Sequence, residues 1–329
     1  MSRFTWHGGG LEAARARFGD SRGEGDAWID LSTGINPAAW PVPADLEIDW
    51  QRLPSLAALA ALEAAAAKHF GVDPAFVCAV PGTEVGLRLA GTLLPEPARY
   101  LTPCYRTHGE LFGTATPIAR ADWRGEGEGT TILANPNNPD GDIVPRERLM
   151  AAVAQGSPTN WLVVDEAFAD PDPSVSIAAL VSDERPLAIF RSFGKFFGLA
   201  GVRLGFVIGP RPLVDRFRAR LGAWPVSAAA IAIGTAAYRD RRWIAQAREQ
   251  LHNRALALDV LLRRAGYKPR GECPLFRLIE VADGHALFER LAERHILTRP
   301  FDEQPRWLRL GLPDSDADYD RLAQALAYG

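Results

Sequence analysis

Short apolar runs alternate with helix-length amphipathic segments between about residues 75 and 208, and this alternation restricts the fold more than any other feature of the sequence. The apolar runs have the length of strands that are buried on both faces, and each amphipathic segment has the length of one helix. We therefore expect an α/β unit with a mostly parallel sheet and helices on both faces. Strands are expected in AFVCAV, ARYLTP, TTILANP, NWLVVDEAF, PLAIFRSF and RLGFVIG, and helices in TEVGLRLAGTLL and PRERLMAAVAQG.

The segments on either side of this region have a different texture. The first 40 residues are rich in glycine, proline and tryptophan, and we expect an extended arm with one short helix, LEAARARF. An alanine-rich helix is expected at about 55–70, with Gly71 as its C-terminal stop signal. From about residue 211 a long helical region precedes LFRLIEV, GHALFERLAERH, ILTRPF and RWLRLGLP, which predict a smaller α+β domain. The predicted divisions are an N-terminal arm at 1–40, a large domain at 41–215 and a small C-terminal domain at 216–329.

Composition and charge argue against several classes of protein. The chain has 329 residues, of which 47% are hydrophobic and 23% charged, and a formal net charge of −3, so no general positive field favours nucleic acid. The most apolar stretches carry charges within a helix length, and MSRFTWHGGG has no apolar signal core. The three cysteines match no metal or redox spacing. We expect a cytoplasmic protein with no membrane, nucleic-acid or metal partner.

Polar residues that could carry chemistry follow several of the expected strands. Asp165 ends an apolar run in WLVVDEAF, and Lys195 follows the next strand in SFGKFFGLAGVRLGF. In doubly wound sheets ligands bind at the carboxyl ends of strands. Gly82 and Thr83 open a helix directly after a strand, where backbone N–H groups can bind a phosphate. Each signal alone also has an ordinary explanation, such as a turn cap for Asp165 or a solvated side chain for Lys195.

The conjunction of motifs is more specific than any one of them. In chain order the sequence carries a strand followed by Gly-Thr, then PCY, NPNNPDG, VVDEAF and SFGKFFGLAGVRLGF. This order and spacing resemble the fold-type-I pyridoxal 5'-phosphate (PLP) enzymes of the class I/II aminotransferase superfamily, over roughly residues 28–312. The resemblance implies a PLP cofactor, a large domain with a mostly parallel seven-stranded sheet flanked by helices, a smaller α+β domain, and a homodimer.

The resemblance also gives a role to each matching residue. Lys195 matches the lysine that forms a Schiff base with PLP, and apolar neighbours favour the neutral amine that attacks a carbonyl. Asp165 matches the carboxylate that pairs with the pyridine nitrogen and keeps it protonated. The remaining matches are Asn138 for the ring hydroxyl, Tyr105 for stacking on the ring, and Gly82, Thr83, Ser192 and Arg203 for the cofactor phosphate.

Three positions depart from the usual pattern of these transaminases. Phe168 stands where most carry a tyrosine that bonds the ring hydroxyl. Leu53 stands where many carry a tyrosine that reaches the cofactor phosphate in the partner subunit. Gly194 replaces the usual serine or threonine beside the lysine.

Two N-terminal segments narrow the resemblance. WHGGG and IDLSTGINP resemble segments of the threonine-phosphate decarboxylases of cobalamin biosynthesis, as does VDEAF with its Phe168. That resemblance implies decarboxylation of L-threonine O-3-phosphate, a small phosphorylated amino acid, to (R)-1-aminopropan-2-yl phosphate. Arg309 matches the arginine that binds the substrate α-carboxylate, and Arg299 and His7 are candidates for its phosphate. Asn36 either holds the substrate edge or only forms a turn before a proline.

Other functions stay open at the level of sequence. Whether CO₂ or the α-proton leaves depends on orientation above the ring, which the sequence does not specify, so an aminotransferase of the histidinol-phosphate type is the main alternative. A PLP-binding regulator without turnover is a further alternative, although we would expect it to carry an added DNA-binding domain. The last alternative is an α/β protein without a cofactor.

Overall fold

The chain forms two compact units in the computed structural model, which describes residues 2–20, 27–125 and 127–327. Unit 1 comprises Met1–Ala38, Pro139–Asp142 and Glu249–Gly329, and unit 2 comprises Ala39–Asn138 and Ile143–Arg248. The division into an arm and two domains at residues 40 and 215 stays a prediction, because compactness alone does not show which segments fold independently.

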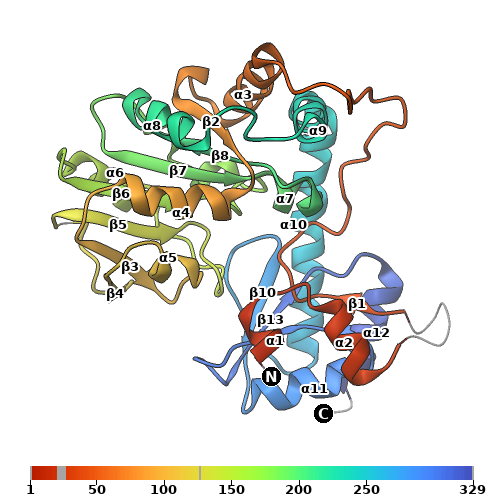
Figure 1. The fold of residues 1–329 in the computed structure, drawn as a ribbon. Helices are drawn as coiled ribbons and strands as arrows, with labels where there is room; N and C mark the ends of the chain where they lie inside the picture. The colour runs from red at the N-terminus through yellow and green to blue at the C-terminus, as the bar shows by residue number, and fades with distance from the viewer. Residues whose placement is uncertain (1, 21–26, 126, 328–329) are drawn as a thin grey trace. The chain divides into compact units, whose positions relative to one another are not determined.

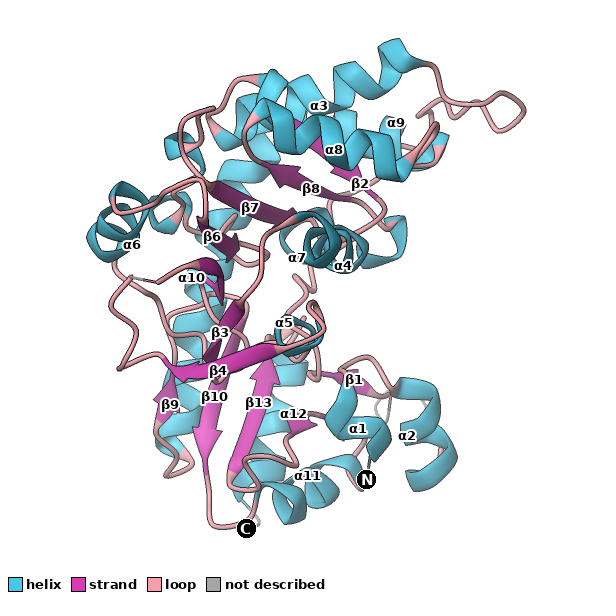
Figure 2. Ribbon diagram, turned by 60° about the vertical axis from the view of Figure 1, so that its left-hand side comes forward, coloured by secondary structure: helices cyan, strands magenta, loops and turns pink. Residues whose placement is uncertain are grey.

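Unit 2 is built on a seven-stranded sheet with the order β2-β8-β7-β6-β5-β3-β4 (Figures 1 and 2). All neighbouring strands from β7 to β4 are parallel, whereas β8 is antiparallel to both of its neighbours. The predicted mostly parallel sheet of seven strands is therefore confirmed. The strands are β2 (Val77–Val80), β3 (Ala98–Thr102), β4 (Ala115–Ala119), β5 (Gly129–Ala134), β6 (Asn160–Asp165), β7 (Leu187–Ser192) and β8 (Gly205–Ile208).

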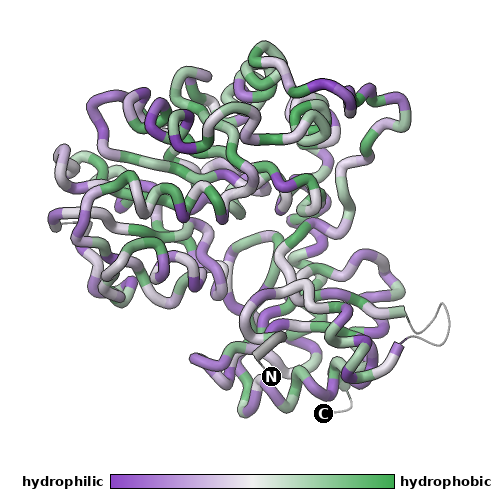
Figure 3. Tube along the Cα trace, viewed as in Figure 1, coloured by the Kyte–Doolittle hydropathy of each residue, from purple (hydrophilic) through white to green (hydrophobic). Residues whose placement is uncertain are grey.

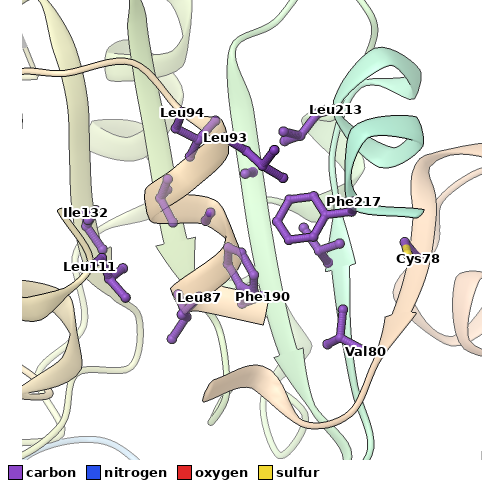
Figure 4. Packing of buried hydrophobic residues seen from close by; sticks show 14 of the residues in the cluster. Cys78, Val80, Leu87, Leu93, Leu94, Leu111, Ile132, Phe190, Leu213 and Phe217 are labelled. Atoms are coloured by element: carbon purple, nitrogen blue, oxygen red, sulfur yellow. The ribbon is translucent and has the colours of Figure 1, made fainter. Parts of the chain in front are cut away.

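Helices α4 and α8 cover one face of this sheet. Leu87 and Leu93 of α4 and Phe217 of α8 pack with Val80 and Phe190 from the strands in one buried hydrophobic cluster (Figure 4). This packing fixes the beginning of α4 beside the ends of β2 and β7. The helices of unit 2 are α3 (Leu56–Phe70), α4 (Thr83–Leu93), α5 (Thr107–Glu110), α6 (Arg146–Ala154), α7 (Phe193–Phe196), α8 (Arg211–Leu221) and α9 (Ala228–Arg239), and α10 (Arg241–Arg264) begins in unit 2 and ends in unit 1.

The opposite face of β7 carries a buried charge network. Side chains alternate along a strand, so Arg191 points away from the α4 cluster. Its guanidinium donates to Glu166 at 3.1 Å and to Asp170, and it lies 4.7 Å from the centre of the Phe70 ring of α3. His69 completes the network with an Nε2–Oδ1 distance of 2.9 Å to Asp170. Burial alone raises the pKa of Asp170, but the charge of Arg191 and the bond to His69 bring that pKa down to about 2.

Unit 1 contains a four-stranded antiparallel sheet, in the order β12-β13-β10-β9, and a parallel pair of β1 with β11. The Phe288 ring of α11 lies 5.1 Å from Phe4 of α1 and 6.1 Å from Phe18 of α2, so both N-terminal helices are packed onto this unit. Its elements are α1 (Ser2–Trp6), α2 (Leu11–Phe18), β1 (Ile29–Asp30), β9 (Pro269–Arg270), β10 (Phe276–Glu280), α11 (Gly284–Ala292), β11 (Ile296–Leu297), β12 (Arg299–Pro300), β13 (Trp307–Gly311) and α12 (Asp316–Ala327).

The differences between the predicted and observed elements have physical reasons. The extended arm with a single helix is wrong, because α1 is also helical and its Phe4 is buried. Strand β4 was not predicted, since it contains a proline and lies half-exposed at the sheet edge. The expected single strand in ILTRPF divides at Thr298 into β11 and β12, which pair in different sheets.

The alanine-rich helix is confirmed with its predicted end signals. The Ser55 hydroxyl accepts a hydrogen bond from Ala58 N at 3.1 Å, and Gly71 ends the helix with a φ of 71°. Figure 3 shows hydrophobic segments mainly inside each unit, and hydrophilic segments in outer loops and along outer helices such as α8. Among the described residues, none of the helices combines the length and the apolar composition that crossing a membrane requires.

Replacing the buried arginine by methionine (Arg191→Met) should lower the free energy of unfolding by about 3–5 kcal/mol, because two buried carboxylates lose their guanidinium partner. Urea unfolding followed by circular dichroism measures this loss. The control is Arg211→Met, which removes an exposed ion pair with Asp183 and should change stability far less. Similar losses in both variants would contradict a stabilising role for the buried network.

Candidate functional site

The polar residues singled out in the sequence gather along one edge of the seven-stranded sheet. The strand register pairs Val80 of β2 with Gly205 of β8, and Gly205 with Ser192 of β7. Because β8 alone is reversed, the beginning of β8 lies beside the ends of the other strands. Asp165 ends β6 along the same edge, next to Phe190 of β7. The candidates Gly82, Thr83, Tyr105, Asn138, Lys195 and Arg203 lie in the loops or helical turns at these strand ends.

Gly82 and Arg203 approach each other closely at this edge. Gly82 precedes α4 with a φ of 88°, and a Cβ atom on it would lie 2.8 Å from Nη2 of Arg203. Arg203 is an exposed residue with a φ of 56°, and its Nη1 donates to the Ala200 carbonyl at 3.1 Å. A Cβ on Gly205 would lie 2.7 Å from Thr83 N, so glycine also lets β8 approach the start of α4. The first-turn N–H groups of α4 and this guanidinium can together bind a phosphate.

Lys195 lies in α7, one helical turn that directly follows β7. Phe193 and Phe197 on either side of it are fully buried and stack with ring centres 4.6 Å apart. Phe197 also stacks on Trp243 at 5.5 Å. The aromatic neighbours noted in the sequence thus anchor the turn in the core. The partly buried lysine places its Nζ 5.7 Å from the centre of the Phe168 ring.

Asp165 is held by a histidine that sequence reasoning gave no role. The Asp165 side chain is buried, and its Oδ2 lies 3.2 Å from Nε2 of the fully buried His108 of α5. Its Oδ1 accepts from Ala167 N at 3.1 Å. The His108 ring meets the Tyr105 ring edge-on, with centres 5.8 Å apart. These contacts fix the orientation of the carboxylate.

Tyr105 and Asn138 flank the same region. The Tyr105 hydroxyl donates to Glu84 of α4 at 3.0 Å, and Glu84 also accepts from Thr107 at 2.9 Å. Burial raises the pKa of Tyr105 to about 12, so the phenol stays neutral at physiological pH. Asn138 is partly buried in the loop after β5. The buried Asn135 stabilises that loop, because its Oδ1 accepts a hydrogen bond from Val144 N at 2.8 Å.

Gly194, one of the departures from the transaminase pattern, has a steric reason. A Cβ at this position would lie 2.7 Å from Cα of Ala200, which belongs to the backbone of the following turn. The side chain of a serine or threonine beside the lysine, which the resemblance implies, therefore has no room unless this backbone shifts.

Arg299 and Arg309 are cross-strand neighbours in unit 1, paired in the register of β12 and β13. They are 9% and 3% exposed. Nη2 of Arg309 donates to the Ser32 carbonyl at 2.8 Å, and Nη2 of Arg299 donates to the Trp6 carbonyl at 3.1 Å. Burial and then the charge of Arg299 lower the pKa of Arg309 to about 9. Two buried positive charges in register favour the binding of an anion.

The two remaining candidates also lie in unit 1. His7 is exposed after the end of α1, with its ring 6.3 Å from that of Trp6. Asn36 is buried, and its Oδ1 accepts from Ala38 N at 3.0 Å. This bond forms a local turn around Pro37, which is one of the two alternatives that the sequence left open for Asn36.

Comparison with known proteins gives a consistent set of relatives. The family described as aminotransferase class I and II matches residues 123–326. The chain is 40% identical to a threonine-phosphate decarboxylase of a Sinorhizobium species over 99% of each chain. It is 39% identical to the Pseudomonas aeruginosa protein of the same name, over 97% of this chain and 96% of the other. It is 31% identical to histidinol-phosphate aminotransferase 2 of Rhizobium meliloti, over 91% and 92% respectively.

Solved structures share the fold. A histidinol-phosphate aminotransferase from Sinorhizobium meliloti, solved in complex with pyridoxal-5'-phosphate, superposes with a TM-score of 0.80 at 20% identity, covering 97% of this chain and 93% of that one. The L-threonine-O-3-phosphate decarboxylase from Porphyromonas gingivalis superposes with a TM-score of 0.75 at 18% identity, covering 91% and 98%. At these identities the likeness concerns the fold, and the predicted fold class is confirmed.

Proposed function

This chain belongs to the aminotransferase class I and II family, and from that premise we propose that it is a PLP-dependent decarboxylase of L-threonine O-3-phosphate. The observation that carries the proposal is the 40% and 39% identity, over nearly the whole chain, to two proteins named threonine-phosphate decarboxylase. The second candidate is an aminotransferase of the histidinol-phosphate type, which the 31% identical relative supports. The proposed reaction belongs to cobalamin biosynthesis, and we propose a cytoplasmic location from the same resemblance.

The residues at the sheet edge of unit 2 fit PLP. A dianionic phosphate suits the cradle of Gly82, the N–H groups at the start of α4 and the Arg203 guanidinium, which a Cβ on Gly82 would obstruct. A protonated pyridine nitrogen suits Asp165, whose carboxylate His108 orients. We assign the remaining cofactor contacts to Thr83, Tyr105, Asn138, Ser192 and Lys195.

PLP, when bound, supplies an electron-withdrawing ring that accepts the electron pair left at the substrate α-carbon. The residues of this chain have separate tasks around it. Lys195 would hold PLP through its amine and, in its protonated form, would deliver a proton to the α-carbon after CO₂ has left. Asp165 keeps the ring nitrogen protonated, and Tyr105 supports the ring face as a neutral phenol. Phe168 cannot bond the ring hydroxyl, which leaves that contact to Asn138.

The arginine pair of unit 1 suits a substrate with two anionic groups. We propose that Arg309 binds the α-carboxylate and that Arg299 binds the phosphate, with His7 and Asn36 as further substrate contacts. An anion between the two guanidinium groups offsets the burial and repulsion that lower the pKa of Arg309. A neutral amino acid side chain would provide no such compensation.

We further propose a homodimer whose contact surface includes residues 46–56. Trp50, Leu53 and Leu56 are 76%, 65% and 80% exposed, and adjacent exposed apolar side chains of this size usually mark an interaction site. A groove of about 630 Å³ beside them is lined by Leu46, Leu53, Pro54 and mainly small or apolar residues of α3 and α9, together with the charged residues Asp49, Arg52 and Arg239. In Figure 1 this segment is the red-brown coil that leads into α3.

The reaction itself is tested with the PLP-loaded enzyme and L-threonine O-3-phosphate, by following CO₂ release. Lys195→Ala should reduce the rate by more than about 10³-fold without changing the circular dichroism spectrum, because it removes the amine that handles the proton. Borohydride reduction of the wild type should add the mass of the cofactor at Lys195. Amino transfer to 2-oxoglutarate without CO₂ release would instead support the second candidate.

A Gly82→Ala substitution should weaken PLP binding by roughly 10- to 100-fold, because its methyl group displaces the Arg203 guanidinium from a charge-assisted contact. Titration of the apoenzyme with PLP, followed by absorbance, measures the affinity. The control is Gly113→Ala, at an exposed glycine whose added Cβ meets nothing within 4 Å. Unchanged affinity in Gly82→Ala would argue against the phosphate cradle.

The dimer surface is tested with Leu53→Glu, which should convert the dimer to a monomer in sedimentation experiments at micromolar concentration, because it buries a charge in an apolar contact. Leu256→Glu is the control, since Leu256 is similarly exposed, at 61%, but lies outside this segment. A wild-type monomer, or a dimer that persists in Leu53→Glu, would refute this surface.

A further inference from the structure

We infer that Gly8 and Ser32 are positioning residues for the arginine pair: Ser32 presents the carbonyl that holds Arg309, and Gly8 is a glycine because a side chain there would push that carbonyl away. This inference rests on the proposed function in taking Arg299 and Arg309 as the site for the substrate anions. It gives the WHGGG and DLSTG segments a shared physical task, which is to orient two buried guanidinium groups.

The position of Gly8 supplies the first step. A Cβ atom on Gly8 would overlap the carbonyl oxygen of Ser32 and lie 2.8 Å from its carbonyl carbon. That same oxygen accepts from Nη2 of Arg309 at 2.8 Å. Residue 8 must therefore be a glycine for lack of space, and any added side chain would displace the Ser32 carbonyl that accepts from Arg309.

The Ser32 hydroxyl joins the N-terminal segment to β1. Its Oγ accepts from Gly9 N at 2.7 Å and donates to Oδ1 of Asp30, which also accepts from Ser32 N at 2.9 Å. Ser32 is buried, and β1 pairs in register with β11, which directly precedes Thr298 and Arg299. One buried hydroxyl thus connects the N-terminal segment to the end of β1, two residues before the acceptor carbonyl of Ser32.

Arg299 is oriented from the same segment. Its Nη2 donates to the carbonyl oxygens of Trp6 at 3.1 Å and of Thr5 at 3.4 Å. The Thr5 hydroxyl donates to Asp302 at 2.6 Å, which ties this backbone to the chain just beyond β12. Both arginines therefore donate to backbone carbonyl oxygens near the N-terminus, Arg299 to Thr5 and Trp6, and Arg309 to Ser32.

A carbonyl oxygen can hold a guanidinium group without bringing a negative charge to it, which a carboxylate cannot do. A guanidinium has five N–H donors in a fixed fork, so holding one of them to a carbonyl sets the direction of the others. A carbonyl dipole stabilises the guanidinium without cancelling its net charge, whereas a buried carboxylate at the same distance would cancel it. The bonds to these carbonyl groups thereby orient the two guanidinium groups for a ligand with two negative groups.

The test uses PLP-loaded Gly8→Ala and Ser32→Ala, with Gly113→Ala as the matched control. In both test variants the KM for L-threonine O-3-phosphate should rise about 10-fold or more, while kcat should fall by less than about threefold. The contact with the substrate phosphate is the same in substrate and transition state, and the contact with the carboxylate is not strengthened as CO₂ leaves. The dissociation constant of inorganic phosphate, measured by calorimetry, should rise in parallel. The absorbance of the bound cofactor should stay unchanged, and Gly113→Ala should match the wild type.

Unchanged KM and unchanged phosphate affinity in both folded variants would overturn the inference, as would a loss of cofactor absorbance that accompanies the change in KM. A wild-type holoenzyme without CO₂ release would refute the proposed function alone. The phosphate titrations of the three variants would still decide the inference in that case, since they measure the anion site without turnover. A wild-type holoenzyme that binds neither phosphate nor L-threonine O-3-phosphate would overturn both.

Discussion

The antiparallel pairing of β8 between β2 and β7 is the constraint on which the candidate site of unit 2 depends. In an all-parallel sheet, the loop that precedes a strand lies at the opposite edge of the sheet from the loops that follow the neighbouring strands. Because β8 is reversed, Arg203, which lies just before β8, is at the edge where β7 ends. The pairing of Gly205 with Val80 on one side and with Ser192 on the other fixes the position of Arg203 there. A slip of one residue would turn every side chain of β8 to the other face, so the hydrophobic core also protects the register of the site.

The buried charge network stabilises the same strand ends from the opposite face. Glu166 follows Asp165 in the chain, and Arg191 precedes Ser192, so these two network residues are direct neighbours of candidate site residues. Since successive side chains on a strand point to opposite faces, the ion pair of Arg191 with Glu166 holds the two strand ends together from behind. The polar residues of the candidate site therefore project from a rigid edge of the sheet. The free-energy cost of burying the charge of Arg191 is offset by its bonds to Glu166 and Asp170, which also fix the strand ends.

The sequence was sufficient for the features that depend on local pattern, and insufficient for those that depend on contacts between distant residues. Local patterns account for the strands of unit 2 other than β4, for α3 with its Ser55 cap, and for the order of motifs along the chain. His108 lies 57 residues from Asp165, and Gly9 lies 23 residues from Ser32, so no spacing rule connects them. The role of Gly8 is equally invisible in sequence, because it depends on which carbonyl lies above it. The division of ILTRPF into β11 and β12 reflects two different pairing partners, which a strand propensity does not encode.

The two proposed anion sites of this chain solve the same chemical problem in different ways. Arg203 is exposed near the start of α4, so its charge is already solvated, and in the proposed site it would add affinity for a phosphate. Arg299 and Arg309 are buried and held by carbonyl oxygens, so their charges are desolvated before any ligand arrives. A ligand with a single anionic group would form fewer contacts with these buried guanidinium groups, so we expect the proposed site to favour ligands with two anionic groups. The exposed arginine of the proposed cofactor site is suited to retaining the cofactor, and the buried pair of the proposed substrate site is suited to selecting the substrate.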